Sequence, residues 1–183
     1  MTQERFPHLN LDELKELATC RFIEEKADVV ALGPPGHGKT HIALAVAYEA
    51  VKLGYSVRFK RAIDIINEMS EAKDEKNLNS YTKTLNRCKL LIIDEVGYLP
   101  YDINATGFLF QIISARYETA STFYTTNYEF SKWSQFIEYK SAIKAIVGRI
   151  AHHSIILNMN GPIAWRLEHA RSRSIDKPEV SSS

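Results

Sequence analysis

The feature that most constrains the fold is the stretch GPPGHGKTH, from Gly33 to His41. Its first eight residues match the pattern G-x-x-x-x-G-K-[ST] in full. The short apolar run DVVAL precedes it, as in a buried parallel strand, and helix-compatible apolar residues follow as far as Leu53. Glycines let backbone N–H groups converge on an anion, and the first turn of the helix adds its positive dipole end. The stretch therefore predicts a loop that wraps a phosphate chain.

The whole loop is assigned to phosphate binding. The residues assigned are Gly33, Pro34, Pro35, Gly36, His37, Gly38, Lys39, Thr40 and His41. Lys39 can bind the β and γ phosphates, and the Thr40 hydroxyl can ligate Mg²⁺. We expect His37 to point from the loop and give it no catalytic role. The alternative is a surface turn rich in Gly and Pro, which would need neither the strand before it nor the helix after it.

Two carboxylates follow the apolar run LLII, at Asp94 and Glu95. The chain between Lys39 and Asp94 has room for a helix, a strand and a further helix. In P-loop enzymes an Asp at a strand end holds Mg²⁺. A Glu directly after it can polarise an attacking water. A solvated acidic loop is one alternative, and a small-molecule P-loop kinase is another, although such a kinase has no need of the second carboxylate.

The order of elements predicts the fold class. Strands are expected at 28–33, 55–61, 89–95, 121–127 and 154–159, and helices alternate with them. This alternation is typical of an α/β fold with a five-stranded parallel sheet flanked by helices. Ligands of such sheets bind at the carboxyl ends of the strands. Gly33, Asp94 and Asn127 all fall there, and Asn127 can reach a γ-phosphate and the attacking water.

Composition narrows the class of partner. Lys and Arg number 23 against 22 Asp and Glu, so the net charge of +1 gives no global attraction to polyanions. A nucleic-acid site would have to be a local patch, and two basic groups are candidates: Arg58, Lys60 and Arg61, and then Lys83, Arg87 and Lys89. We expect no signal peptide and no membrane span, and therefore a cytoplasmic protein with reduced cysteines and no membrane partner.

Several segments resemble one branch of the AAA+ ATPases. They are GPPGHGKTHIALAVAYEAVKLGY, LLIIDEVGYLP, FLFQIISARYE, STFYTTNYEFSKW and the stretch RIAHHS. In this order they are similar to the IstB-like ATP-binding helpers of insertion-sequence transposases, which are relatives of the DnaC helicase loaders. The resemblance covers roughly residues 9–157. It implies a P-loop NTPase of the AAA+ class that takes ATP and Mg²⁺.

The resemblance also implies site roles. The loop from Gly33 to Thr40 would be the Walker A motif, and Asp94 and Glu95 would be Walker B. Asn127 would be sensor 1. The implied metal ligands are Thr40 and Asp94.

Two further arginines have roles only through the resemblance. Arg149, in VGRIAHH, matches an arginine that would act as a finger in a neighbouring subunit's site. The family has Asp before this arginine, whereas this chain has Gly148. Arg166, in GPIAWRL, is the candidate for sensor 2 in a minimal C-terminal lid. The catalytic set would be Glu95, Asn127 and Arg149, and catalysis would need an oligomer.

The expected organisation is a lead-in helix and linker over residues 1–27, an AAA+ ATPase domain over 28–170 and a disordered tail over 171–183. The family usually has an N-terminal domain of several tens of residues that contacts the transposase. The predicted function is ATP binding and hydrolysis coupled to assembly of a homo-oligomer on duplex DNA, in support of an insertion-sequence transposase. One alternative is a DnaC-like helicase loader. Another is a nucleotide-dependent interaction module with little or no turnover.

Overall fold

Five parallel strands form one sheet in the computed structural model, which describes residues 11–160. The strands are β1 (Asp28–Leu32), β2 (Val57–Arg61), β3 (Leu90–Val96), β4 (Ser121–Thr126) and β5 (Ser154–Asn158). Their order in the sheet is β2-β3-β4-β1-β5. The predicted α/β fold with a five-stranded parallel sheet is confirmed. Strand β4 lies between the strand that leads into the glycine-rich loop and the strand that ends in the acidic pair.

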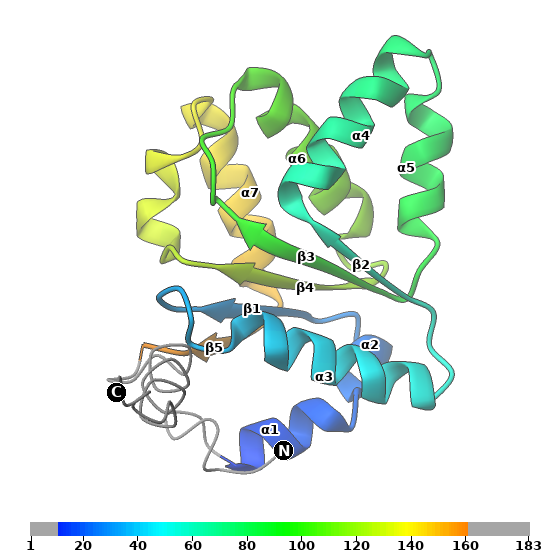
Figure 1. The fold of residues 1–183 in the computed structure, drawn as a ribbon, viewed down its shortest axis with the longest axis vertical. Helices are drawn as coiled ribbons and strands as arrows, with labels where there is room; N and C mark the ends of the chain where they lie inside the picture. The colour runs from blue at the N-terminus through cyan, green and yellow to red at the C-terminus, as the bar shows by residue number, and fades with distance from the viewer. Residues whose placement is uncertain (1–10, 161–183) are drawn as a thin grey trace, which may run out of the picture.

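Helices cover both faces of the sheet (Figure 1). One face carries α1 (Leu11–Ala18), α2 (Arg21–Glu24) and α3 (Lys39–Lys52), and the other carries α4 (Ala62–Asp74), α5 (Leu78–Asn86), α6 (Ile103–Arg116) and α7 (Lys140–His152). A short 3₁₀ helix, η2 (Phe130–Gln135), joins β4 to α7. Helix α2 and η2 were not predicted, because elements of one or two turns show too little apolar periodicity to be read from sequence.

The burial of each strand follows from its place in the sheet. Every residue of β4 is buried, as is every residue of β3 except Glu95, whereas the edge strands β2 and β5 are mostly exposed or half-buried. Strands covered by helices on both faces need sequences with almost no charged residues. This explains the segments LLII in β3 and TFYT in β4. Strand β2 begins at Val57, two residues later than predicted, because its pairing with β3 begins there, at Leu90.

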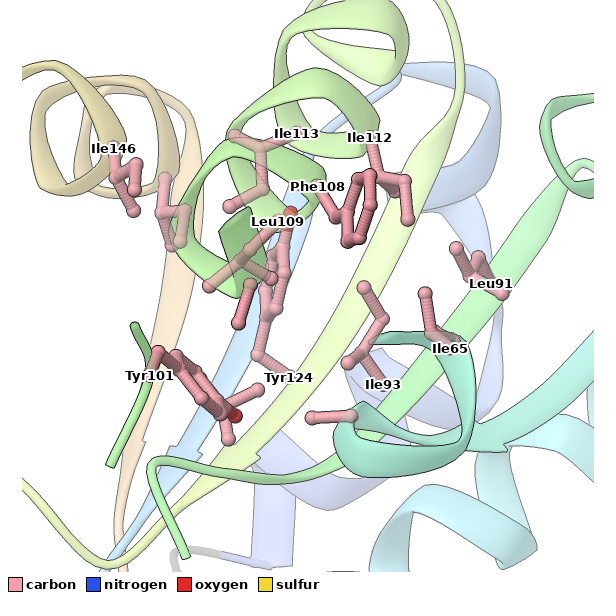
Figure 2. Close-up of a cluster of buried hydrophobic side chains, with 14 of the residues drawn as sticks. Ile65, Leu91, Ile93, Tyr101, Phe108, Leu109, Ile112, Ile113, Tyr124 and Ile146 are labelled. Atoms are coloured by element: carbon pink, nitrogen blue, oxygen red, sulfur yellow. The ribbon is translucent and has the colours of Figure 1, made fainter. Parts of the chain in front are cut away.

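The larger core lies between the sheet and helices α4, α6 and α7, and Figure 2 shows its centre. Phe108, Leu109, Ile112 and Ile113 of α6 face the strand residues Leu91, Ile93 and Tyr124, with Ile65 of α4 and Ile146 of α7 at the sides. Burying one such side chain stabilises the fold by about 1.5–3 kcal/mol. A second cluster joins α1 and α3 to the other face of the sheet. The two clusters pack the helices against both faces of the sheet.

The ends of two helices show why the loops turn where they do. Asp102 accepts a hydrogen bond from the Ala105 N–H at 2.7 Å and so caps α6. Gly54, with φ 86°, directly follows the last turn of α3, and the N–H groups of Gly54 and Tyr55 donate to Val51 and Ala50. This is a Schellman motif, and it confirms Gly54 as the predicted stop signal. None of the helices formed by residues 11–160 has the length and apolarity that a membrane crossing requires.

Candidate functional site

The glycine-rich loop joins β1 to α3, as predicted, and lies against neighbouring backbone. The Gly33 N–H donates to the Thr126 carbonyl at 3.2 Å, which ties the loop to the end of β4. A Cβ on Gly33 would lie 2.9 Å from the backbone carbon and oxygen of Met159. Gly36 and Gly38 both have φ 85°, a conformation that favours glycine. The loop shape therefore depends on glycine at three positions.

Lys39 begins α3 and its ammonium group lies inside the loop. The side chain is only 7% exposed, and Nζ donates to the carbonyls of Gly33 at 2.6 Å and Pro34 at 2.8 Å. Helix α3 has 14 residues, so its N-terminus carries a substantial positive dipole. The ammonium and the helix N-terminus both act at this loop, which is the environment that an anion requires.

Thr40 links the glycine-rich loop to Asp94, near the end of β3. Its hydroxyl lies 3.0 and 3.2 Å from the two carboxylate oxygens of Asp94, a residue that is 4% exposed. Lys39 and Thr40 come from the start of α3 and Asp94 from the end of β3, so the fold brings together the two motifs that the sequence analysis singled out. Arg61 pairs with Asp94 in the register of β2 and β3. Its hydrogen bonds to Asp64 are the main cause that raises the pKa of Arg61, and the charges of Glu95 and Asp94 add to it.

Glu95 leaves the regular strand geometry. Its φ is 61°, in the left-handed region, and the pairing of β3 with β4 shifts between Ile93 and Val96. Tyr124 pairs with Ile93 and Thr126 with Val96, so Asp94 and Glu95 together oppose the single residue Thr125. This is a β-bulge, a feature that re-aims side chains. Asp94 is buried against Thr40 while Glu95 is exposed at the edge of the site.

The other predicted residues lie in different places. Asn127 is exposed and directly follows β4, next to the loop contact at Thr126. Arg149 lies on α7, on the face opposite α3, where its guanidinium stacks over Phe110 at 4.9 Å. It also donates to the carbonyl of Ala145 at 3.2 Å. Arg166 lies outside the described residues. Arg149 is therefore not brought into the site of its own chain.

His37 and His41 are the two histidines of the loop region. The His37 Nδ1 lies 3.2 Å from the Pro35 carbonyl, and His41 is exposed in the first turn of α3. The expectation that His37 points from the loop stays a prediction, as does the part of both histidines in phosphate binding.

The oxygen groups at this site fit a magnesium nucleotide. The Thr40 hydroxyl and the Asp94 carboxylate are hard oxygen ligands in contact with each other, and within residues 11–160 no group of three His, Cys, Asp or Glu side chains could hold a metal by itself. Mg²⁺ is usually bound by one or two protein oxygens together with phosphates and waters. The donor set therefore matches Mg²⁺ that arrives with a nucleotide, and it does not match an all-protein metal site.

Sequence reasoning missed Thr125. Its hydroxyl donates to the Asp94 carboxylate and accepts the Glu95 N–H at 2.9 Å, and the residue is 1% exposed. The segment STFYTTNYEFSKW contains it, but only Asn127 was singled out there. The available signal was the pair of hydroxyl residues, Thr125 and Thr126, directly before Asn127.

Comparison with known proteins gives the family. The family model for IstB-like ATP binding protein matches residues 4–173. The ATP-binding protein assigned to insertion sequence IS5376 of Geobacillus stearothermophilus is 38% identical over 90% of this chain and 65% of its own length. The corresponding protein of IS232 from Bacillus thuringiensis is 35% identical over 93% of this chain and 68% of its own. The chain thus spans about two thirds of the length of these relatives.

Solved structures agree on the fold. The crystal structure of the DnaC helicase loader superposes with a TM-score of 0.63 at 25% identity, over 82% of this chain and 91% of that one. The crystal structure of DnaI superposes with a TM-score of 0.70 at 19% identity, over 86% of this chain and 94% of that one. The fold is that of the AAA+ P-loop proteins, as the resemblance of the sequence implied. Because the family model covers most of its length, this chain belongs to the IstB-like ATP binding protein family.

Proposed function

We propose that this chain binds ATP with Mg²⁺ and hydrolyses it as part of a homo-oligomer on duplex DNA, in support of an insertion-sequence transposase. The observation that carries the proposal is the contact between Thr40 and Asp94. The glycine-rich loop, a hydroxyl and a buried carboxylate meet there, within hydrogen-bond distance, at one edge of the sheet. The insertion-sequence names of the relatives at 35–38% identity support the biological setting.

Each described residue would have a separate part in the reaction. The loop N–H groups and Lys39 would bind the phosphates, and Thr40 and Asp94 would hold Mg²⁺, which supplies charge neutralisation at the β and γ phosphates. Glu95, aimed out of the strand by the bulge, would orient and polarise the attacking water. Asn127 follows the next strand and would contact the γ-phosphate.

Arg149 would act on a neighbouring subunit. Helix α7 ends beside the start of β1, where the Asp28 N–H donates to the His153 carbonyl at 2.8 Å, and the phosphate loop follows the other end of β1. An arginine near this end of α7 would serve a site across a subunit contact, where it would neutralise charge that develops in the transition state. It would first have to leave its contacts with Phe110 and Ala145. Arg166 is proposed as sensor 2, a nucleotide-binding role that rests on the resemblance alone.

The second basic group is the better candidate for DNA phosphates. In the first group Lys60 donates to Glu68 and Arg61 to Asp64, so these charges are largely compensated. Among residues 11–160, Lys83, Arg87 and Lys89 form no ion pair. Lys83 and Arg87 also line a pocket of about 410 Å³ together with Asn79, Thr82, Asn86 and Gln111. Such donors would contact phosphates and give salt-dependent binding with little sequence preference.

The two other functions remain distinct hypotheses. A helicase loader would use the same nucleotide chemistry, and the DnaC superposition at 25% identity supports it less than the relatives at 35–38% support the transposition setting. An interaction module with negligible turnover would be indicated if Glu95→Gln left the hydrolysis rate unchanged. The predicted domain limits and the cytoplasmic location belong to the proposal as well.

The experiment that tests the proposal is ATP hydrolysis with and without long duplex DNA, at two salt concentrations. We expect DNA to stimulate turnover and salt to weaken the stimulation. A titration of DNA binding against salt tests the basic group. The double variant Lys83→Ala/Arg87→Ala should make the slope of log DNA affinity against log salt shallower by about 0.9 for each phosphate that the protein no longer neutralises. Lys52→Ala is the matched control, since Lys52 is exposed on α3 and paired with Glu49. Turnover that ignores DNA at both salts would contradict the proposed coupling, and no turnover at all would contradict the enzyme.

A further inference from the structure

We infer that Thr125 is a positioning residue. Its single hydroxyl fixes the orientation of the Asp94 carboxylate and the backbone bulge that presents Glu95. The inference rests on the proposed function of Asp94 and Glu95 in ATP hydrolysis. Within the described residues the hydrogen bonds of the Thr125 hydroxyl go to Asp94 and Glu95, so its effect would pass through the two acids. A hydroxyl has one hydrogen to donate and two lone pairs to accept with. Both capacities are used here.

The donor side holds the Asp94 carboxylate. The Thr125 hydroxyl donates to Oδ1 of Asp94, and the Thr40 hydroxyl lies 3.0 Å from the same oxygen. One hydroxyl comes from β4 and the other from α3, so the carboxylate is fixed between two rigid elements. A buried carboxylate with fixed partners keeps one orientation, and hydrogen-bonded partners behind a metal ligand set its geometry. Thr125 would thus set the position of the Asp94 carboxylate oxygen that is proposed to hold Mg²⁺.

The acceptor side holds the bulge that presents Glu95. The Glu95 N–H, displaced from regular pairing, donates to the Thr125 hydroxyl at 2.9 Å. A left-handed non-glycine residue persists only where its surroundings hold it. The neighbouring Thr126 hydroxyl donates to the Val96 carbonyl at 2.9 Å on the far side of the bulge. Of these two β4 threonines, only Thr125 bonds both to a carboxylate and to the backbone of the other acid.

This arrangement gives a matched pair of variants. Thr125→Val and Thr126→Val each remove one hydroxyl from a threonine that is 1% exposed, on adjacent residues of the same strand. Thr125→Val takes one of the two hydroxyl donors from Asp94 and leaves the Glu95 N–H without its acceptor. Thr126→Val disturbs only backbone partners, the Val96 carbonyl and the Tyr128 N–H. Thr125→Ser keeps the hydroxyl and should restore the wild-type behaviour.

The first readout is Mg²⁺-dependent binding of a fluorescent, non-hydrolysable ATP analogue. With EDTA present, all variants should bind the analogue within about twofold of one another, since the hydrogen bonds of the Thr125 hydroxyl go to the two acids and the metal is absent. In a Mg²⁺ titration the half-saturating concentration should rise about 10–100-fold in Thr125→Val, the range expected when a metal ligand loses its supporting hydrogen bond. Thr126→Val and Thr125→Ser should stay close to the wild type. This readout needs no hydrolysis.

The second readout is single-turnover hydrolysis at saturating Mg²⁺ and ATP. Thr125→Val should remain at least about tenfold slower, because the bulge that aims Glu95 has no hydroxyl to hold it even when the metal site is filled. Equal Mg²⁺ titrations and equal rates for Thr125→Val and Thr126→Val would overturn the inference. A wild type that binds Mg²⁺–analogue but does not hydrolyse ATP would overturn the proposed function, while the Mg²⁺ titration would still decide the role of Thr125. Thr125→Ala replaces Thr125→Val if circular dichroism shows that the valine variant does not fold.

Discussion

Replacing Gly33 with alanine should destabilise the protein by about 2–6 kcal/mol. The new Cβ would lie 2.9 Å from the backbone carbon and oxygen of Met159, well inside the roughly 3.5–4.0 Å of a good contact, and backbone atoms cannot swing aside as a side-chain end does. Overpacking of this kind costs about 1–3 kcal/mol. The positive φ of 156° adds strain of order 1–3 kcal/mol for a residue with a side chain.

Two other glycines separate these contributions. Gly54 has φ 86° and open space where a Cβ would be added, so Gly54→Ala should show strain alone, about 1–2 kcal/mol. Gly148 lies within α7 with open space and no unusual φ, so Gly148→Ala should stabilise by about 1 kcal/mol. Urea unfolding followed by circular dichroism gives the three values. Equal losses for Gly33→Ala and Gly54→Ala would refute the contact with Met159 as a rigid constraint.

The same variants should separate stability from nucleotide binding. The Gly33 carbonyl accepts from the Lys39 ammonium at 2.6 Å, so a shift of Gly33 moves the group proposed to bind the phosphates. We expect ATP affinity to fall in Gly33→Ala and to be unchanged in Gly54→Ala and Gly148→Ala, measured well below the unfolding midpoint. Unchanged affinity in Gly33→Ala would contradict the proposed use of the loop.

Two further predictions concern stability. Burial raises the pKa of Asp28 to about 7, against opposing effects of the Thr122 N–H and the Arg116 charge. The folded state therefore holds this proton more tightly than the unfolded chain, and the stabilisation is lost as pH rises from about 4 to 7, by up to about 4 kcal/mol at about 1.36 kcal/mol per pKa unit. Asp28→Asn should remove that pH dependence in urea unfolding, and parallel curves for both proteins would contradict it. Gly97→Ala would place a Cβ 2.7 Å from the Phe136 ring at φ 83°, and its thermal midpoint should fall by roughly 8 °C or more; an unchanged midpoint would show that the ring yields.

The sequence predicted the sheet and the loop because both depend on local patterns. Apolar runs separated by helical periods indicate parallel strands covered on both faces, and the glycines, lysine and threonine of the loop are contiguous. The carboxyl ends of parallel strands meet at one edge, so the approach of Asp94 to Thr40 followed from topology alone. No side-chain detail was needed for that inference.

The parts that could not be predicted depend on register and on distant contacts. The bulge at Glu95 and the position of Thr125 opposite two acids arise from a shift in the pairing of β3 with β4. No residue type in either strand predicts that shift. Arg61 was grouped with surface cations, yet the register of β2 and β3 places it beside Asp94. The need for Gly33 to lack a Cβ comes from Met159, at the far end of the described chain.

The central claim is that Glu95 acts within its own site and Arg149 acts in the site of a neighbouring subunit. The most direct measurement is ATP hydrolysis by Glu95→Gln and Arg149→Ala, each alone and then mixed in equal amounts with duplex DNA. Each variant alone should be nearly inactive. In mixed assemblies an intact site of Arg149→Ala can face the intact arginine of Glu95→Gln, so activity should recover. If the two variants co-assemble, as a cross-linking control would show, and the mixture stays as inactive as its components, the central claim is contradicted.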